Sequence, residues 1–84
     1  MSFELEVIAF DLASCLKAEQ GGAHRIELCA NPHEGGTTPS AGMIKLARKS
    51  TKLQLFPIIR PRGGDFLYDS TELMSMIEDI KLCK

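Results

Sequence analysis

Short apolar runs alternate along the chain with longer segments in which apolar residues recur at helical spacing. The apolar runs cover residues 5–10, 24–30 and 53–59. The helical segments cover residues 12–20 and 41–50, and a third follows Asp69 with an apolar stripe of Leu73, Met76, Ile77, Ile80 and Cys83. Strands that alternate with helices in this way are typical of an α/β fold with a parallel sheet. The pattern therefore predicts three strand-helix units.

Polar residues mark where these helices begin and end. Asp11 stands directly before the first helical segment, as an N-cap residue does, and Thr38 before Pro39 or Ser40 offers a start for the second. Asp69 and Glu72 have the spacing of a capping box at the start of the third segment. Gly21 and Gly22 end the first segment. These signals give each predicted helix a defined start.

Three parallel strands would leave an unpaired edge on each side of the sheet. The sequence is therefore typical of the first part of a larger barrel, and residues 1–84 are expected to be the N-terminal portion of one domain with no internal boundary. Exposed strand edges and apolar surface also predict self-association.

Strand parity places charged residues on one face of the predicted sheet. Because side chains alternate along a strand, Glu6, Glu27 and Arg60 should line the inner face, and Val7, Leu28 and Ile59 should pack under the helices. Two glutamates and one arginine are tolerable there only if they are paired, which favours a Glu27–Arg60 ion pair. Such a pair fits a structural role and a catalytic role equally well.

The strands end on polar and turn residues, and in parallel α/β folds ligands bind at that rim. Arg60 and Arg62 could clamp a carboxylate or a phosphate, with the backbone amides of Gly63 and Gly64 close by. An equally good interpretation is a turn in which Asp65 neutralises Arg62. The predicted ligand-binding residues are Glu27, Asn31, Arg60, Arg62, Gly63, Gly64 and Asp65.

Cysteine usage and charge narrow the class of protein. Cys15, Cys29 and Cys83 are widely spaced and odd in number, which argues against a disulfide framework or a zinc site built from them. Cys29, at a strand end, could be a nucleophile, a Cu(I) ligand or a small buried apolar residue.

The ten basic and eleven acidic residues give no reason to expect a nucleic-acid partner. No apolar run approaches the roughly 18 residues of a membrane span, so a cytoplasmic setting is expected. No Walker loop, dinucleotide fingerprint, HExxH or GxSxG motif identifies a reaction.

Three blocks of the sequence resemble the CutC family, the copper homeostasis proteins. The blocks are "GGAHRIELCANPHEGGTTPSAG", "PIIRPRGGDFLY" and "LMSMIEDIK", in this order and at these separations. The resemblance runs from about Leu5 to about Lys81. It implies a TIM-type (β/α)8 barrel of which this chain covers the first three units, a cytoplasmic and often oligomeric protein, and Cu(I) binding through cysteines, including the one that matches Cys29.

The chain departs from that family pattern at its first strand. Some relatives carry cysteines where this sequence has Ile8 and Ala9, so a site with several thiolates is not available there. Cys29 would then need help from Met43 or His33 to hold Cu(I), because a single thiolate rarely makes a tight site. The resemblance thus predicts copper as the metal. The alternative is an enzyme or small-molecule binder that holds an anion at the rim without a metal.

Overall fold

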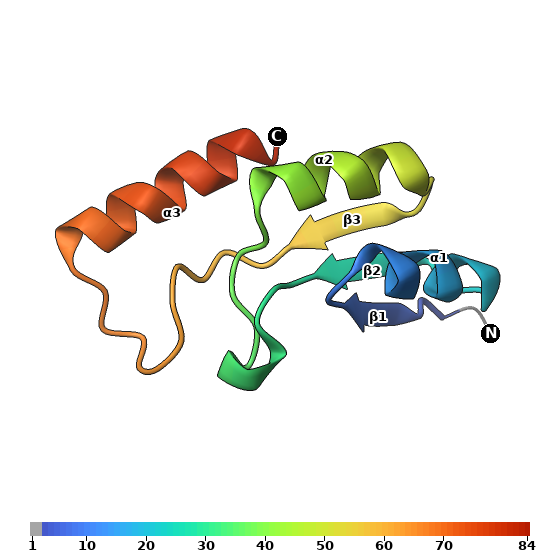
Figure 1. Ribbon diagram of the computed structural model, residues 1–84, viewed down its shortest axis with the longest axis horizontal. Helices are drawn as coiled ribbons and strands as arrows, with labels where there is room; N and C mark the ends of the chain where they lie inside the picture. The colour runs from blue at the N-terminus through green and yellow to red at the C-terminus, as the bar shows by residue number, and fades with distance from the viewer. Residues whose placement is uncertain (1–2) are drawn as a thin grey trace.

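The strands and helices alternate as predicted. A computed structural model describes residues 3–84 of the chain (Figure 1). The elements are β1 (Glu6–Ala9), α1 (Leu12–Gln20), β2 (Arg25–Leu28), the 3₁₀ helix η1 (Pro32–Glu34), α2 (Ala41–Ser50), β3 (Gln54–Pro57) and α3 (Ser70–Leu82). The strands form one parallel sheet in the order β1-β2-β3. Each strand is shorter than its apolar run, because the chain leaves the ladder before the run ends.

The predicted helix starts are confirmed for α1 and α3, and of the two predicted starts for α2 the structure selects Ser40 and not Thr38. The Asp11 side chain accepts a hydrogen bond from the Ser14 backbone N–H, and Ser40 does the same for Met43. Asp69 and Glu72 form the complete capping box, in which each side chain accepts from the other residue's backbone N–H. These bonds satisfy N–H groups that the first helical turn cannot pair internally.

The core lies between the sheet and the helices α1 and α2, which cover one face of the sheet (Figure 1). Ile26 and Leu28 of the central strand are fully buried and point into this core. Val7 and Leu55, from the outer strands, pack against it. The predicted placement of Val7 and Leu28 under the helices is therefore confirmed. Ile59 lies beyond the end of β3 and takes no position in the sheet.

The opposite face of the sheet carries an ion pair that differs from the predicted one. Arg25 Nε lies 2.8 Å from Glu6 Oε2, and the Arg25 guanidinium lies 5.6 Å from the centre of the Phe56 ring. The predicted Glu27–Arg60 pair is wrong, because β3 ends at Pro57 and Arg60 belongs to the loop that follows. Both partners of the Arg25–Glu6 pair are partly exposed, so it adds at most about 1 kcal/mol.

Helix α3 does not fold back onto the sheet. In Figure 1 it extends past the ends of the strands, and its last turn lies beside the start of α2. Leu73, Ile77 and Ile80, from the predicted apolar stripe, are all exposed. The helix is thus formed as predicted, but none of its side chains is buried in a core within residues 3–84.

Two isoleucine substitutions test where the core lies. Ile26→Ala should lower the free energy of unfolding by about 2–5 kcal/mol, because it leaves a cavity in the core at a side chain that is fully buried. Ile80→Ala makes the same chemical change at a side chain that is 44% exposed, and it should cost less than about 0.5 kcal/mol. Urea denaturation followed by circular dichroism measures both values. Equal losses in the two variants would place the core elsewhere.

Candidate functional site

Two loops meet at the rim formed by the carboxyl ends of the strands. One loop runs from β2 to α2 and the other from β3 to α3. The Thr38 backbone N–H donates to the Arg60 carbonyl oxygen at 2.9 Å, and the Arg60 N–H donates to Thr38 Oγ1 at 2.8 Å. This reciprocal pair fixes the second loop against the first, so the rim is one connected structure.

The Arg60 side chain joins the two loops a second time. Nη1 donates to the carbonyl oxygens of Glu34 at 2.5 Å and Gly36 at 3.1 Å, and Nη2 donates to the Gly64 carbonyl at 3.0 Å. The Phe66 ring lies 4.9 Å from the guanidinium carbon. Within residues 3–84, no carboxylate forms an ion pair with Arg60, and its buried Nε has no hydrogen-bond acceptor. The groups that bind the Arg60 guanidinium are therefore neutral: three carbonyl oxygens and an aromatic ring.

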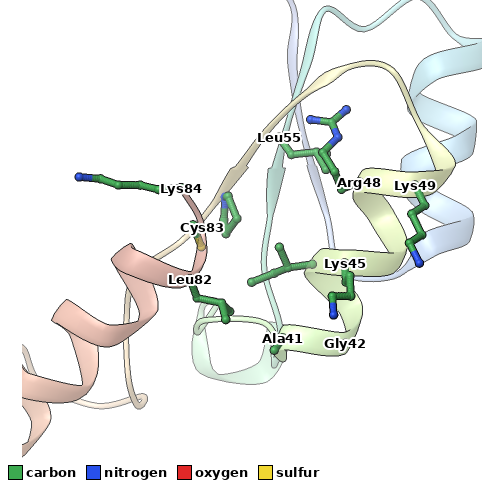
Figure 2. A pocket seen from close by; sticks show the side chains of 11 residues that line it. Ala41, Gly42, Lys45, Arg48, Lys49, Leu55, Leu82, Cys83 and Lys84 are labelled. Carbon is green, nitrogen blue, oxygen red and sulfur yellow. The ribbon is translucent and has the colours of Figure 1, made fainter.

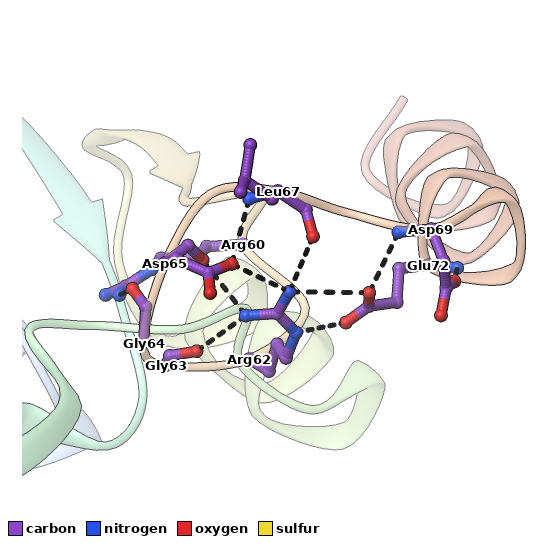
Figure 3. A network of polar contacts seen from close by, with 8 residues as sticks. All are labelled: Arg60, Arg62, Gly63, Gly64, Asp65, Leu67, Asp69 and Glu72. Carbon is purple, nitrogen blue, oxygen red and sulfur yellow. Dashed lines mark hydrogen bonds and ion pairs between the residues drawn. The ribbon is translucent and has the colours of Figure 1, made fainter.

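Arg62 has a different environment, in which its donors are fully used (Figure 3). Nη1 donates to the carbonyls of Gly63 and Asp65, and Nη2 donates to the Leu67 carbonyl and to Asp65 Oδ1. Nε pairs with Glu72 of α3. Because a guanidinium has five N–H donors, this set leaves none for a ligand. The ion pair with Glu72, and then that with Asp65, raise the pKa of Arg62. Arg62 thus holds the loop to the start of α3.

Asp65 completes the salt-bridged turn that was one of the two predicted interpretations. Its Oδ1 accepts from the Leu67 backbone N–H at 3.0 Å and from Arg62 Nη2 at 3.2 Å. These two bonds, the Leu67 bond first, lower the pKa of the Asp65 carboxyl. The carboxylate therefore neutralises Arg62 and shapes the turn.

The two glycines of this loop present their carbonyl oxygens to the arginines. Gly63 accepts from Arg62 and Gly64 accepts from Arg60, whereas the sequence predicted that their amides would face a ligand. A Cβ on Gly63 would overlap the Glu34 side chain, down to its Cβ at 2.9 Å. Gly64 has φ of 83°, which favours glycine. Both positions need glycine for the shape of the rim.

The structure separates Asn31 and Glu27 from the arginines. Asn31 adopts a left-handed backbone conformation with φ of 53°, and its Nδ2 donates to Thr37 Oγ1 at 2.8 Å, so it shapes the first loop. Glu27 lies on the inner face of β2, where it lines a shallow depression with Glu6, Arg25 and Phe56. The predicted site residues thus divide between the rim loops and the sheet face.

Cys29 lies just after β2 and is 3% exposed. Its Sγ is close to Gly36, where a Cβ would come within 3.5 Å of it. Burial, and then the charge of Glu27, raise the pKa of the Cys29 thiol. Residues 3–84 contain no cluster of three or more His, Cys, Asp or Glu side chains that could hold a metal ion. The environment of Cys29 is that of a buried thiol.

Several rim residues were not predicted as part of the site. Glu72 was identified only as a capping residue, and the capping box was the one signal that placed it near Arg62. Thr38, Glu34 and Phe66 contact Arg60, and nothing in their spacing indicates this. Their roles depend on how the two loops meet.

A parallel sheet, helices on one of its faces and a polar rim at the strand ends define the first part of a (β/α) barrel. The CutC family profile matches residues 3–84. The chain belongs to the CutC family.

Relatives and a solved structure support this assignment. The chain is 57% identical over 81 residues to a CutC family protein of Parabacteroides distasonis, covering 95% of this chain and 33% of the relative. It is 49% identical over 82 residues to the human copper homeostasis protein cutC homolog, covering 98% of this chain and 30% of the relative. A crystal structure of CutC from Streptococcus agalactiae matches with a TM-score of 0.85 and 38% identity, covering 96% of this chain and 40% of that one. The chain thus spans about a third of the length of these curated relatives.

Among the described residues, no helix combines the length and the apolar composition that crossing a membrane requires.

The titration of Asp65 tests the turn. The hydrogen bonds from Leu67 and Arg62 stabilise the ionised carboxylate of Asp65. They should therefore be fully present above 3.8, the pKa of an unperturbed aspartate, and lost as the pH falls through the lower pKa of Asp65 in the folded chain. A carbon NMR titration should therefore give a midpoint below 3.8. Arg62→Ala should raise that midpoint only partway, because the Leu67 N–H still donates to Asp65.

Asp11 is the matched control for this titration. The backbone and side chain of Ser14 lower its pKa, so Arg62→Ala should leave its midpoint unchanged. An Asp65 midpoint that Arg62→Ala does not move would contradict the turn.

Proposed function

We propose that the chain contributes to copper homeostasis as part of a CutC-type protein, and that its own role is to bind a small anionic ligand at the rim through Arg60. The link to copper rests on family membership and on the name of the human relative. The anion site rests on the environment of Arg60.

The observation that carries the proposal is the unbalanced charge of Arg60. Three of its five donors bond to carbonyl oxygens, and the described residues offer no carboxylate to neutralise it. The buried Nε of Arg60 has no hydrogen-bond acceptor within residues 3–84, which adds to the cost of holding this charge. Arg62, two residues away, carries the same charge but is neutralised by Asp65 and Glu72. The two arginines therefore have different functions.

The chemistry of the rim favours a small carboxylate or phosphate. A guanidinium binds both in a planar, charge-assisted geometry. Phe66 lies against the Arg60 guanidinium and limits the directions in which the side chain can move. Gly64, with its left-handed backbone, directs its carbonyl oxygen to the Nη2 donor. A ligand oxygen would take the place of the Gly64 carbonyl or bond beside it.

Cu(I) binding through Cys29 is the second candidate, and the residues present fit it poorly. A copper site needs a deprotonated thiolate, but burial raises the pKa of this thiol. A single thiolate also needs further soft ligands, and no group of three or more His, Cys, Asp or Glu side chains includes Cys29 within residues 3–84. Met43 packs against the hydrophobic core. The family resemblance is the reason to test copper, and the geometry favours the anion.

The anion site is tested by removing the Arg60 charge. Arg60→Gln should weaken binding of inorganic phosphate and citrate at least about tenfold, because one charge-assisted hydrogen bond is worth about 1.5–3 kcal/mol. The dissociation constants are measured by NMR titration of the rim amides, with Gly36 and Gly64 as reporters.

Arg48→Gln is the matched control. Arg48, on α2, also donates to carbonyl oxygens, those of Thr51 and Leu53, but it lies away from the rim. This variant should bind both anions as the unmodified chain does. Equal losses in the two variants would show attraction to net charge alone and would contradict a site at Arg60.

A Cu(I) titration tests the second candidate. We expect the chain to lose Cu(I) to a competing chelator, because the Cys29 thiol is buried and lacks partner ligands. Cys29→Ser and Cys15→Ser should then behave alike. A chelator-resistant complex with one Cu(I) per chain, abolished by Cys29→Ser and kept by Cys15→Ser, would assign the metal to Cys29 and overturn this expectation.

A further inference from the structure

The loop that follows β2 is a compact unit with a narrow base, and it lies beyond the end of that strand (Figure 1). At the base, the Ala30 N–H donates to the Thr37 carbonyl at 2.8 Å, and the Thr37 N–H donates back to the Ala30 carbonyl at 2.8 Å. Inside the loop, the Gly36 N–H donates to the Asn31 carbonyl at 3.2 Å. Because these bonds join the loop to itself, it can move as one body about its base. Residues 31–36 are termed the lid.

The lid covers the Cys29 side chain. Gly36 is buried, and a Cβ placed on it would come within 3.5 Å of the Cys29 Cβ and Sγ and within 3.9 Å of Ile58 Cδ1. Cys29 itself is 3% exposed. The other lid residues, 31–35, are all exposed to solvent. The lid therefore has one buried residue, and that residue rests against the thiol.

Arg60 fastens the lid to the loop that follows β3. Its Nη1 donates to two lid carbonyls, those of Glu34 at 2.5 Å and Gly36 at 3.1 Å. A Cβ on Gly35 would come within 3.2 Å of the same nitrogen, so the guanidinium lies directly against the lid backbone. Within residues 3–84, every hydrogen bond between the lid and this loop comes from the Arg60 side chain.

The two terminal nitrogens of Arg60 have separate partners. Nη1 holds the lid, whereas Nη2 donates to the Gly64 carbonyl at 3.0 Å, and the proposed anion would bind at Nη2. An anion there leaves both lid bonds in place, and the lid bonds hold the guanidinium in position to receive it. The anion should therefore bind the closed lid more tightly than the open lid. A ligand with that preference stabilises the closed state.

We propose that residues 31–36 are a lid that Arg60 latches closed over Cys29, and that an anion bound at Arg60 strengthens the latch. The second half of this proposal rests on the proposed anion site, and the first half does not. Opening the lid breaks two hydrogen bonds to neutral carbonyls and one buried glycine contact, so it is a local event that leaves the core intact. The occupancy of Arg60 then sets how often the thiol meets solvent.

Alkylation of the cysteines tests the latch. The chain is treated with iodoacetamide, an uncharged reagent, and peptide mass spectrometry follows the label on each cysteine. Arg60→Gln and Arg60→Lys should each speed the labelling of Cys29 at least about tenfold, because neither side chain has the planar fork that bonds both lid carbonyls. Arg60→Lys keeps the positive charge, so it separates the latch from charge alone. Unchanged labelling of Cys29 in both variants would overturn the latch.

Cys15 is the internal control for this measurement. It is fully buried in the core on α1, so its labelling reports unfolding of the whole chain. Its rate should stay unchanged in the Arg60 variants. An equal rise at Cys15 and Cys29 would show that Arg60 supports the fold as a whole, and it would rule out a separate lid.

Arg48→Gln is the matched control variant. Arg48 also donates to two carbonyl oxygens, but it lines a groove of about 470 Å³ that is bordered by α2, β3 and the end of α3, away from the lid (Figure 2). This variant should label at Cys29 as the unmodified chain does. A rise as large as in the Arg60 variants would contradict a latch specific to Arg60.

Inorganic phosphate tests the link between the anion and the lid. At roughly ten times its dissociation constant, phosphate should slow the labelling of Cys29 in the unmodified chain by about an order of magnitude. Sodium chloride at the same ionic strength should not. If phosphate binds in the NMR titration yet leaves the labelling rate unchanged, the link is wrong and the anion site stands. If phosphate does not bind while the Arg60 variants expose Cys29, the anion site fails and the latch stands.

Discussion

Parallel pairing of the three strands is the constraint on which the other features depend. It requires a crossover between consecutive strands, made here by α1 and α2, and it brings the carboxyl ends of all three strands to one edge. The loops after β2 and β3 meet there for that reason. Within residues 3–84 the same pairing leaves β3 with a strand partner on one side. The rim and this strand edge thus have a common origin.

Arg60 and Arg62 lie two residues apart in the loop after β3, but their environments differ because different groups surround them. Arg62 reaches toward α3 and is enclosed by Asp65, Glu72 and three carbonyl oxygens. Arg60 reaches across to the other loop and meets only neutral groups. A guanidinium neutralised within its own loop stabilises structure, whereas one held by carbonyls keeps its charge available. This contrast supports an anion site centred on one arginine, not a clamp of two.

The chemistry of the rim differs from what the family name suggests. A Cu(I) site would need several soft ligands. Burial raises the pKa of the Cys29 thiol, and Cys15 and Cys83 lie on or beside helices and not at the strand end. An anion site needs a positioned positive charge, and the chain has one. The chain belongs to the CutC family, and the proposed anion site rests on its own side chains, not on the family name.

The alternation of elements, the three N-caps and the burial of Leu28 follow from local periodicity and capping chemistry, so the sequence by itself determined them. The partner of Arg60 could not be predicted in this way. Strand parity paired it with Glu27, but β3 ends at Pro57, and where a strand ends depends on its neighbours. The contact of Thr38 with Arg60 spans 22 residues, and two loops must meet before it exists. Local patterns determine the helices and their caps because those hydrogen bonds join residues that are close in the sequence. Only the tertiary structure decided which arginine is neutralised, because that depends on groups brought together by folding.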